Sequence, residues 1–249
     1  QVRLGGRFAG LLVAFWPALA VAMSDVQRPQ VCSEALDVFG NLSIALGRGM
    51  LPYAAEAQRI AVQLFKEPGL SPELKAPAVM VLGHICRALG SETPKLQELL
   101  EVLRIASMMC MWGGKPKLTQ LAVSSKVEAK RQHRRFGAQR ALDSWFRRQA
   151  LTDAVLEAYE GVVLGLKNTH GLALLDEYTS VLLDLLTKCT LNKQTSELVL
   201  LRVLRIMAPL AQGLPGALAT FCWSDEGGCV TKLVDVGSAS GDVSVRHTA

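Results

Sequence analysis

One stretch of this chain occurs twice, 43 residues apart. Residues 38–47 read VFGNLSIALG and residues 81–90 read VLGHICRALG, with both glycines in register. A period in the low forties with helical character is typical of arrays in which each unit is a pair of helices. Such a pair cannot bury its apolar face alone, so neighbouring units stack into a superhelix. The repeat therefore predicts an all-α solenoid.

Composition agrees with a helical array. Half of the residues are hydrophobic and only 6% are aromatic, with Leu and Ala abundant, a balance that favours helices over strands. We therefore expect a HEAT/armadillo-like α-solenoid, a superhelix of antiparallel helix pairs. The six cysteines lack the spacing of a disulfide scaffold, which indicates a reducing compartment. The chain begins with Gln1 in mid-pattern, so we expect a piece of a longer protein.

Glycine and proline mark the expected helix ends. We expect first helices over about 30–46, 72–90, 151–167 and 193–211, and second helices over about 52–65, 94–112 and 171–189. Ser71 is placed to cap the helix that follows it. The helix over 30–46 carries an apolar stripe at Val31, Ala35, Val38, Leu42 and Ala45. Inward positions of the second helices are Ile60, Leu64, Phe65, Leu96, Leu99, Leu100 and Leu103.

Residues 8–24 allow two interpretations. They carry no charge and follow Arg3 and Arg7, as in a secretory signal or a short membrane anchor, although a span needs about 20 apolar residues. The alternative is a pair of buried helices broken at Pro17. We favour the helix pair, because residues 4–8 (LGGRF) align with residues 46–50 and would then end a first helix.

The period breaks over residues 113–149. This segment has ten Lys and Arg against two acidic residues, so it carries +8, whereas the whole chain carries +5 and the remainder therefore about −3. It could bind nucleic acid or an acidic partner, or act as a localisation signal at residues 130–135. We favour a solvated loop with one amphipathic helix near 124–148. The expected organisation is then repeats over 1–112, a basic insert or linker over 113–149, repeats over 150–223, and an irregular tail over 224–249.

The residue types of catalytic and metal sites are scattered. His84 and Cys86 stand two apart on an expected helix, so they point to different sides. Cys222 and Cys229 have no partnering pair at zinc spacing. No glycine-rich phosphate loop follows a strand, and no nucleophile stands beside a base in the pattern. We expect a non-enzymatic protein without a metal or cofactor.

Four stretches, in order, resemble the C-terminal HEAT-repeat region of the importin-beta (karyopherin-beta) family. They are residues 4–19, with the segment FWPAL; residues 30–46, which begin QVC; residues 72–90; and residues 156–167, which read LEAYEGVVLGLK. The last is the most specific, and the resemblance covers about residues 2–212. The linker before the fourth stretch is longer and more basic than is usual in the family, and the tail has no clear counterpart of its closing helix.

The resemblance implies a nuclear import receptor in the cytoplasm, in the nucleus and at the nuclear pore and envelope. Its second helices would line a concave face that binds a basic segment of the importin alpha adapter or of a cargo. Phe-Gly nucleoporins would dock between first helices on the outer face, and the Ran GTPase would engage an N-terminal half that this sequence lacks. We expect neither a membrane nor a nucleic-acid partner.

Acidic side chains on the expected second helices are the candidate partner-binding residues. Long-range attraction of a basic peptide to such a face would weaken with salt. The simpler interpretation of each is an ordinary solvated face. A generic HEAT-repeat scaffold is the alternative function, followed by a membrane-targeted or secreted helical protein and by a nucleic-acid-binding protein that relies on the insert. The candidates are Glu56, Glu98, Glu101, Asp176, Glu177 and Asp184.

Overall fold

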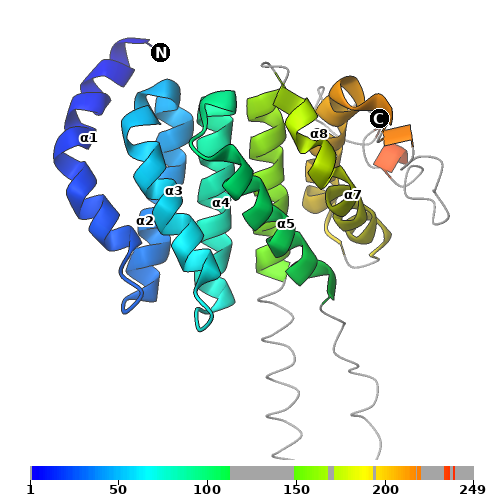
Figure 1. Cartoon of the computed structure of the whole chain (residues 1–249), viewed down its shortest axis with the longest axis horizontal. Helices are drawn as coiled ribbons and strands as arrows, with labels where there is room; N and C mark the ends of the chain where they lie inside the picture. Colours follow the sequence, from blue (N-terminus) through cyan, green and yellow to red (C-terminus); the bar gives the residue numbers. More distant parts are fainter. Residues whose placement is uncertain are drawn as a thin grey trace, which may run out of the picture.

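Helices make up the regular structure of the chain throughout the part described. The computed structural model describes residues 2–112, 149–167, 171–192, 195–216, 218–219, 233–235 and 238, and none of these is in a strand. Helices stand side by side in a curved row from α1 to α8 (Figure 1). The predicted all-α solenoid is confirmed. Most of the insert and most of the tail lie outside the described residues.

The elements before the insert form two helix pairs preceded by one helix. They are α1 (Val2–Met23), α2 (Pro29–Leu46), the 3-10 turn η1 (Gly47–Met50), α3 (Leu51–Lys66), α4 (Pro72–Leu89), the 3-10 turn η2 (Gly90–Glu92) and α5 (Leu96–Trp112). After the insert come a helix over residues 149–166, η4 (Gly171–Leu175), α7 (Asp176–Leu191) and α8 (Glu197–Gly213).

Alternate helices form two layers. The first helices α2, α4, 149–166 and α8 lie next to one another, because α2 packs on α4, and helix 149–166 contacts both α4 and α8. The second helices α1, α3, α5 and α7 form the other layer, each in contact with the next. The core lies between the layers, and its largest fully buried side chains include Phe39, Leu82, Leu103 and Tyr159.

The turn that ends α2 is repeated at the end of α4. Gly47 has φ 54 and ψ −125, and Gly90 has φ 59 and ψ −130. Both combine a positive φ with a negative ψ, a conformation that glycine enters without the steric cost of a β-carbon. Arg48 of the first turn forms an ion pair with Glu92 of the second, so successive turns touch. The 43-residue period is therefore a repeat of backbone geometry.

The α4 backbone and the backbone of helix 149–166 are in direct contact. A β-carbon built on Gly83 would overlap the Cα of Ala158, and one built on Gly165 would overlap the carbonyl oxygen of Cys86. One built on Gly161 would lie 2.5 Å from the Gly83 carbonyl oxygen. The two first helices can approach this closely only because glycine has no side chain.

The predicted break at Pro17 is wrong. α1 runs without interruption from Val2 to Met23, through the glycines expected to end a helix and through Pro17. Proline removes one hydrogen bond from a helix, but Trp16 beside it packs on Phe39 and Tyr53, with ring centroids 5.5 and 5.1 Å apart. This packing offsets the lost bond. Across the described helices, none combines the length and apolar character needed to cross a membrane.

The apolar stripe expected on α2 is also wrong in part. Val31 and Val38 are 42% and 43% exposed, whereas Leu36 and Phe39 are fully buried. Both sets recur at helical spacing, so periodicity alone does not choose between them. Contacts with α1 and α4 bury the side of α2 that carries the larger side chains. Ala35 is the member of the expected stripe that lies in the core.

Other helix predictions hold with small shifts at the ends. Leu96 is half-buried, and the remaining predicted inward positions of α3 and α5 are buried. α5 begins two residues later than Pro94, since Lys95 has φ 42 and is not helical. Ser71 precedes α4 as expected, but its side chain makes no capping hydrogen bond. Ser196 does cap α8, accepting a hydrogen bond from the Val199 N–H.

Candidate protein-binding surface

All six candidate carboxylates lie on second helices, as predicted. Glu56 is on α3, Glu98 and Glu101 are on α5, and Asp176, Glu177 and Asp184 are on α7. They do not share one electrostatic environment, because some are paired with cations of the same layer and others are not.

The two carboxylates of α5 are neutralised by neighbours. Glu98 lies 2.9 Å from the Lys66 Nζ of α3, and this hydrogen bond lowers the pKa of Glu98. Glu101 lies 2.6 Å from Arg104 one turn along α5, which lowers the pKa of Glu101 in the same way. Both pairs are partly exposed to solvent, which weakens their contribution to stability. Their main effect is to reduce the negative potential over α5.

Glu56 belongs to a groove between two second helices. The Trp16 Nε1 of α1 donates a hydrogen bond of 3.1 Å to Glu56. Beside this pair is an open groove of about 660 Å³, which is also lined by Asp25, Arg59 and Ile60. Aromatic, acidic and basic groups therefore meet in one place. Arg59 offsets part of the negative charge there, so this groove does not favour a cation as strongly as its two acidic residues suggest.

The carboxylates of α7 are the ones available to a partner. Asp176, Glu177 and Asp184 are exposed, and within the described part of the chain none of them forms an ion pair. Asp176 and Glu177 stand in the first turn of α7, where the helix dipole favours negative charge. We call these three residues the α7 acidic surface.

A second, apolar groove lies between α1 and α2. It has a volume of about 580 Å³ and is lined mainly by Phe15, Leu19, Val31, Ala35 and Val38. The resemblance implied an apolar groove between two first helices, but this one separates a second helix from a first helix. Val31 and Val38, which were expected in the core but are exposed, are part of the lining of this groove.

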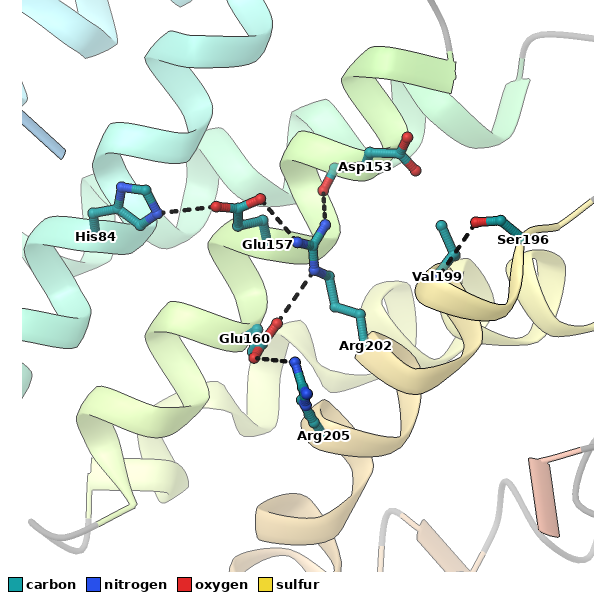
Figure 2. Close-up of polar contacts among 8 residues, drawn as sticks. All are labelled: His84, Asp153, Glu157, Glu160, Ser196, Val199, Arg202 and Arg205. Atoms are coloured by element: carbon teal, nitrogen blue, oxygen red, sulfur yellow. Dashed lines mark hydrogen bonds and ion pairs between the residues drawn. The ribbon is translucent and has the colours of Figure 1, made fainter. Parts of the chain in front are cut away.

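The first-helix layer holds a charged cluster that the sequence did not reveal. His84 Nε2 of α4 lies 3.2 Å from Glu157 Oε1, and Arg202 Nη2 of α8 lies 3.0 Å from Glu157 Oε2 (Figure 2). The hydrogen bond from His84, helped by the charge of Arg202, holds the pKa of Glu157 below its usual value. The partners are 73 and 45 residues apart in the chain. No short motif could have linked them.

The described cysteines are not arranged for chemistry. Cys32, Cys86, Cys110 and Cys189 are buried and free, and burial raises the pKa of Cys86 and Cys189 to about 12 and that of Cys110 to about 11. Thiols of this kind are poor nucleophiles. Over the part of the chain that the structure describes, no three His, Cys, Asp or Glu side chains gather as metal ligands. Cys222 and Cys229 lie outside it.

A protein-family comparison matches most of the chain. The family model described as importin subunit beta-1-like, TPR repeats, matches residues 2–117 and 119–234. The chain is 25% identical over 220 residues to importin subunit beta-1 of Schizosaccharomyces pombe, covering 88% of this chain and 23% of that protein. It is 24% identical over 213 residues to importin subunit beta-1 of Arabidopsis thaliana, covering 84% and 22%. The chain thus spans less than a quarter of these relatives.

Solved structures share the fold. A structure of Kap95p with RanGDP superposes with a TM-score of 0.72 at 21% identity, over 99% of this chain and 26% of that one. The Kap95:Nup1 complex gives 0.73 at 21% identity, over 98% and 26%. Importin beta crystallised in a polyethylene glycol condition gives 0.75 at 18% identity, over 97% and 26%. At these identities the likeness establishes the fold alone.

Proposed function

Because this chain belongs to the importin subunit beta-1-like family, we propose that it is part of a nuclear transport receptor. Its role is to bind other proteins, without catalysis. It would act in the cytoplasm, in the nucleus and at the nuclear pore. The transport role is carried over from relatives that are about four times longer than this chain, so binding has to be tested on the chain itself.

The partner we assign to the second-helix layer is a basic segment, from an importin alpha adapter or from a cargo. The observation that carries this is the α7 acidic surface, whose three carboxylates are exposed and have no cationic partner among the described residues. Opposite charges across an interface speed encounter and select the partner, and salt screens them. Glu98 and Glu101 would contribute less to binding of the basic segment, because they already form ion pairs with Lys66 and Arg104.

Two further partners follow from the family. Kap95p has been solved with RanGDP and with Nup1. We propose Phe-Gly nucleoporins as ligands of the first-helix side of the array, and Ran as a partner of regions outside this sequence. The alternative for the whole chain is a HEAT-repeat scaffold for other proteins. Specific recognition of an importin alpha segment separates the two.

The test is a binding titration of the chain with a basic importin alpha N-terminal peptide at low and physiological salt. We expect the triple variant Asp176→Asn, Glu177→Gln, Asp184→Asn to bind at least about tenfold more weakly, equivalent to about 1.4 kcal/mol, and with a shallower salt dependence. The matched control removes three carboxylates elsewhere, in Glu34→Gln, Glu67→Gln, Glu197→Gln, and should bind as the wild type does. Equal loss in both triples would rule out the α7 acidic surface.

Deletion of residues 113–148 separates this function from nucleic-acid binding. Peptide binding should survive the deletion. The opposite result has two parts: RNA or DNA binds strongly and loses that binding on deletion, and the peptide does not bind at all. In that case the nucleic-acid interpretation of the basic insert would replace the transport role.

A further inference from the structure

The first helices on either side of the insert, where the repeat period breaks, are in contact in the folded chain. Residues 113–148 separate α5 from helix 149–166 in sequence. Helix 149–166 nevertheless packs directly on α4, with Gly83 against Ala158 and Gly165 against Cys86. The first-helix layer therefore continues across this junction, and the charged cluster lies on it.

The cluster links three successive first helices. Glu157 uses its two carboxylate oxygens on different helices, Oε1 toward His84 of α4 and Oε2 toward Arg202 of α8 (Figure 2). Arg202 in turn uses all three of its nitrogens on helix 149–166. They lie 3.0 Å from Glu157, 3.2 Å from Glu160 and 3.2 Å from the carbonyl oxygen of Asp153. Arg205 adds a longer contact of 3.9 Å to Glu160.

Burial distinguishes this cluster from the other ion pairs between repeats. The side chains of His84, Glu160 and Arg202 are 9%, 12% and 19% exposed, whereas Glu157 is 30% exposed and the outer member Arg205 is 41% exposed. The pair Arg48–Glu92 is 77% and 40% exposed, and Lys66–Glu98 is 56% and 38% exposed. Partly buried pairs are screened less by salt, and a planar guanidinium with several bonds is held in one orientation. Removing one partner leaves a poorly solvated charge without compensation.

At the opposite end, α1 takes part in none of the ion pairs among the described side chains, and its side-chain hydrogen bond with a neighbouring helix is the one from Trp16 to Glu56. Open grooves of about 580 and 660 Å³ lie on the two sides of α1, toward α2 and toward α3. Leu11, Val13 and Val21 of α1 are more than 60% exposed. Fewer buried contacts mean a lower local free energy of opening.

We propose that His84, Glu157, Glu160, Arg202 and Arg205 form a clamp that makes α4, helix 149–166 and α8 one rigid block across the junction. The clamp fixes the layer at the point where the basic segment leaves and re-enters it. This conformational role needs no partner, so its test is independent of the proposed transport function.

Hydrogen–deuterium exchange of the full chain tests the clamp. In the wild type, amides of α4, helix 149–166 and α8 should exchange together and slowly, and those of α1 at least about tenfold faster. Arg202→Gln should accelerate exchange at least about tenfold in all three helices, including α4, although the hydrogen bonds of Arg202 all go to helix 149–166. The control Arg48→Gln removes an exposed ion pair and should leave the block unchanged. Faster exchange confined to α8 and helix 149–166 would overturn the proposal.

Two further variants keep the test decisive if Arg202→Gln fails to fold. Arg202→Lys retains the charge with fewer directed bonds and should give a smaller acceleration in the same three helices. The effect of the double variant His84→Gln, Arg202→Lys on the exchange rates should differ from the sum of the effects of the two single variants. The reason is that both residues bond to Glu157 and act through it. If the double variant shows only the sum of the two single effects, the three helices open independently and the proposed clamp is wrong.

Discussion

Gly83 of α4 lies against Ala158 of helix 149–166, so closely that a β-carbon on Gly83 would overlap the Ala158 Cα. The contact is between backbones, which cannot move aside as the end of a flexible side chain can. It joins a helix that precedes the insert to one that follows it. The packing of the two repeat blocks therefore depends on the absence of side-chain atoms at a few positions.

Substituting Gly83 should weaken the whole array. We expect Gly83→Ala to lower the free energy of unfolding by about 1–3 kcal/mol, because the added β-carbon forces the two backbones apart. Urea denaturation measures this. Gly10→Ala is the matched control, a helical glycine of α1 with no atom within 4 Å of an added β-carbon, and it should stabilise by about 0.5–1 kcal/mol. Similar losses in both variants would contradict the close contact.

The paired turns should respond alike. Gly47 and Gly90 have φ 54 and 59, so replacing either by Ala should cost about 1–3 kcal/mol of stability through strain at a positive φ that residues with a β-carbon rarely adopt. Both variants should lose stability, since the two backbones adopt the same geometry, and the loss at Gly90 should be at least as large because Gly90 is buried. Gly49→Ala is the control, because an added β-carbon there meets only an ordinary contact at 3.6 Å. A loss of stability in only one of the two variants would mean that the two turns do not share the same backbone strain.

Acid should act on the array partly through Glu157. Its pKa lies below the usual value of 4.5 in the folded chain, first because of the hydrogen bond from His84. A carboxyl with a depressed folded pKa adds stability above its unfolded pKa and loses it as the pH falls through the folded pKa. The stability of the wild type should therefore fall more steeply below about pH 4.5 than that of Glu157→Gln.

Thermal unfolding of both proteins between pH 7 and pH 3 gives the comparison. Burial, and in smaller part the charge of Glu157, raise the pKa values of Asp37 and Asp153, so Glu157→Gln also lowers the pKa values of these two carboxyls, and the comparison reports Glu157 together with this coupling. Parallel pH profiles of the two proteins would contradict the assignment of the shift to this carboxyl.

The described thiols should be protected. Cys86, Cys110 and Cys189 are buried, and burial raises the pKa of each. Because the thiolate is the reactive form, iodoacetamide at pH 8 should leave these three unmodified in the folded chain and label them all in urea. Peptide mass spectrometry measures both. Rapid labelling of Cys86 without denaturant would mean that α4 opens more readily than its packing implies.

Local patterns predicted a large part of the fold. The glycine period was enough to place the turns at Gly47 and Gly90, and four stretches in order, of which residues 156–167 are the most specific, indicated the family, which the family model confirms. Positions next to prolines and glycines gave most helix ends to within a few residues. These features depend on short-range sterics and hydrogen bonding, which a single sequence carries explicitly.

Other features depend on neighbours that the sequence does not identify. Two sets of α2 residues have the same helical spacing, and contacts with α1 and α4 determine which set is buried. α1 continues through Pro17 because Trp16 finds Phe39 and Tyr53 on other helices. Arg202 and Glu157 meet across 45 residues. The six candidate carboxylates were placed on the right layer, but which of them have cationic partners depended on contacts such as Lys66–Glu98.

The contact of α4 with helix 149–166 also bears on how distant relatives can be found. Helix 149–166 packs on α4 although residues 113–148 intervene in sequence after α5, so the contact does not require a particular length of that segment. Atomic volume at Gly83, Gly161 and Gly165 is not free to vary. A search for further divergent members would therefore do better to weight this glycine triplet heavily and to leave the length of the connection unpenalised.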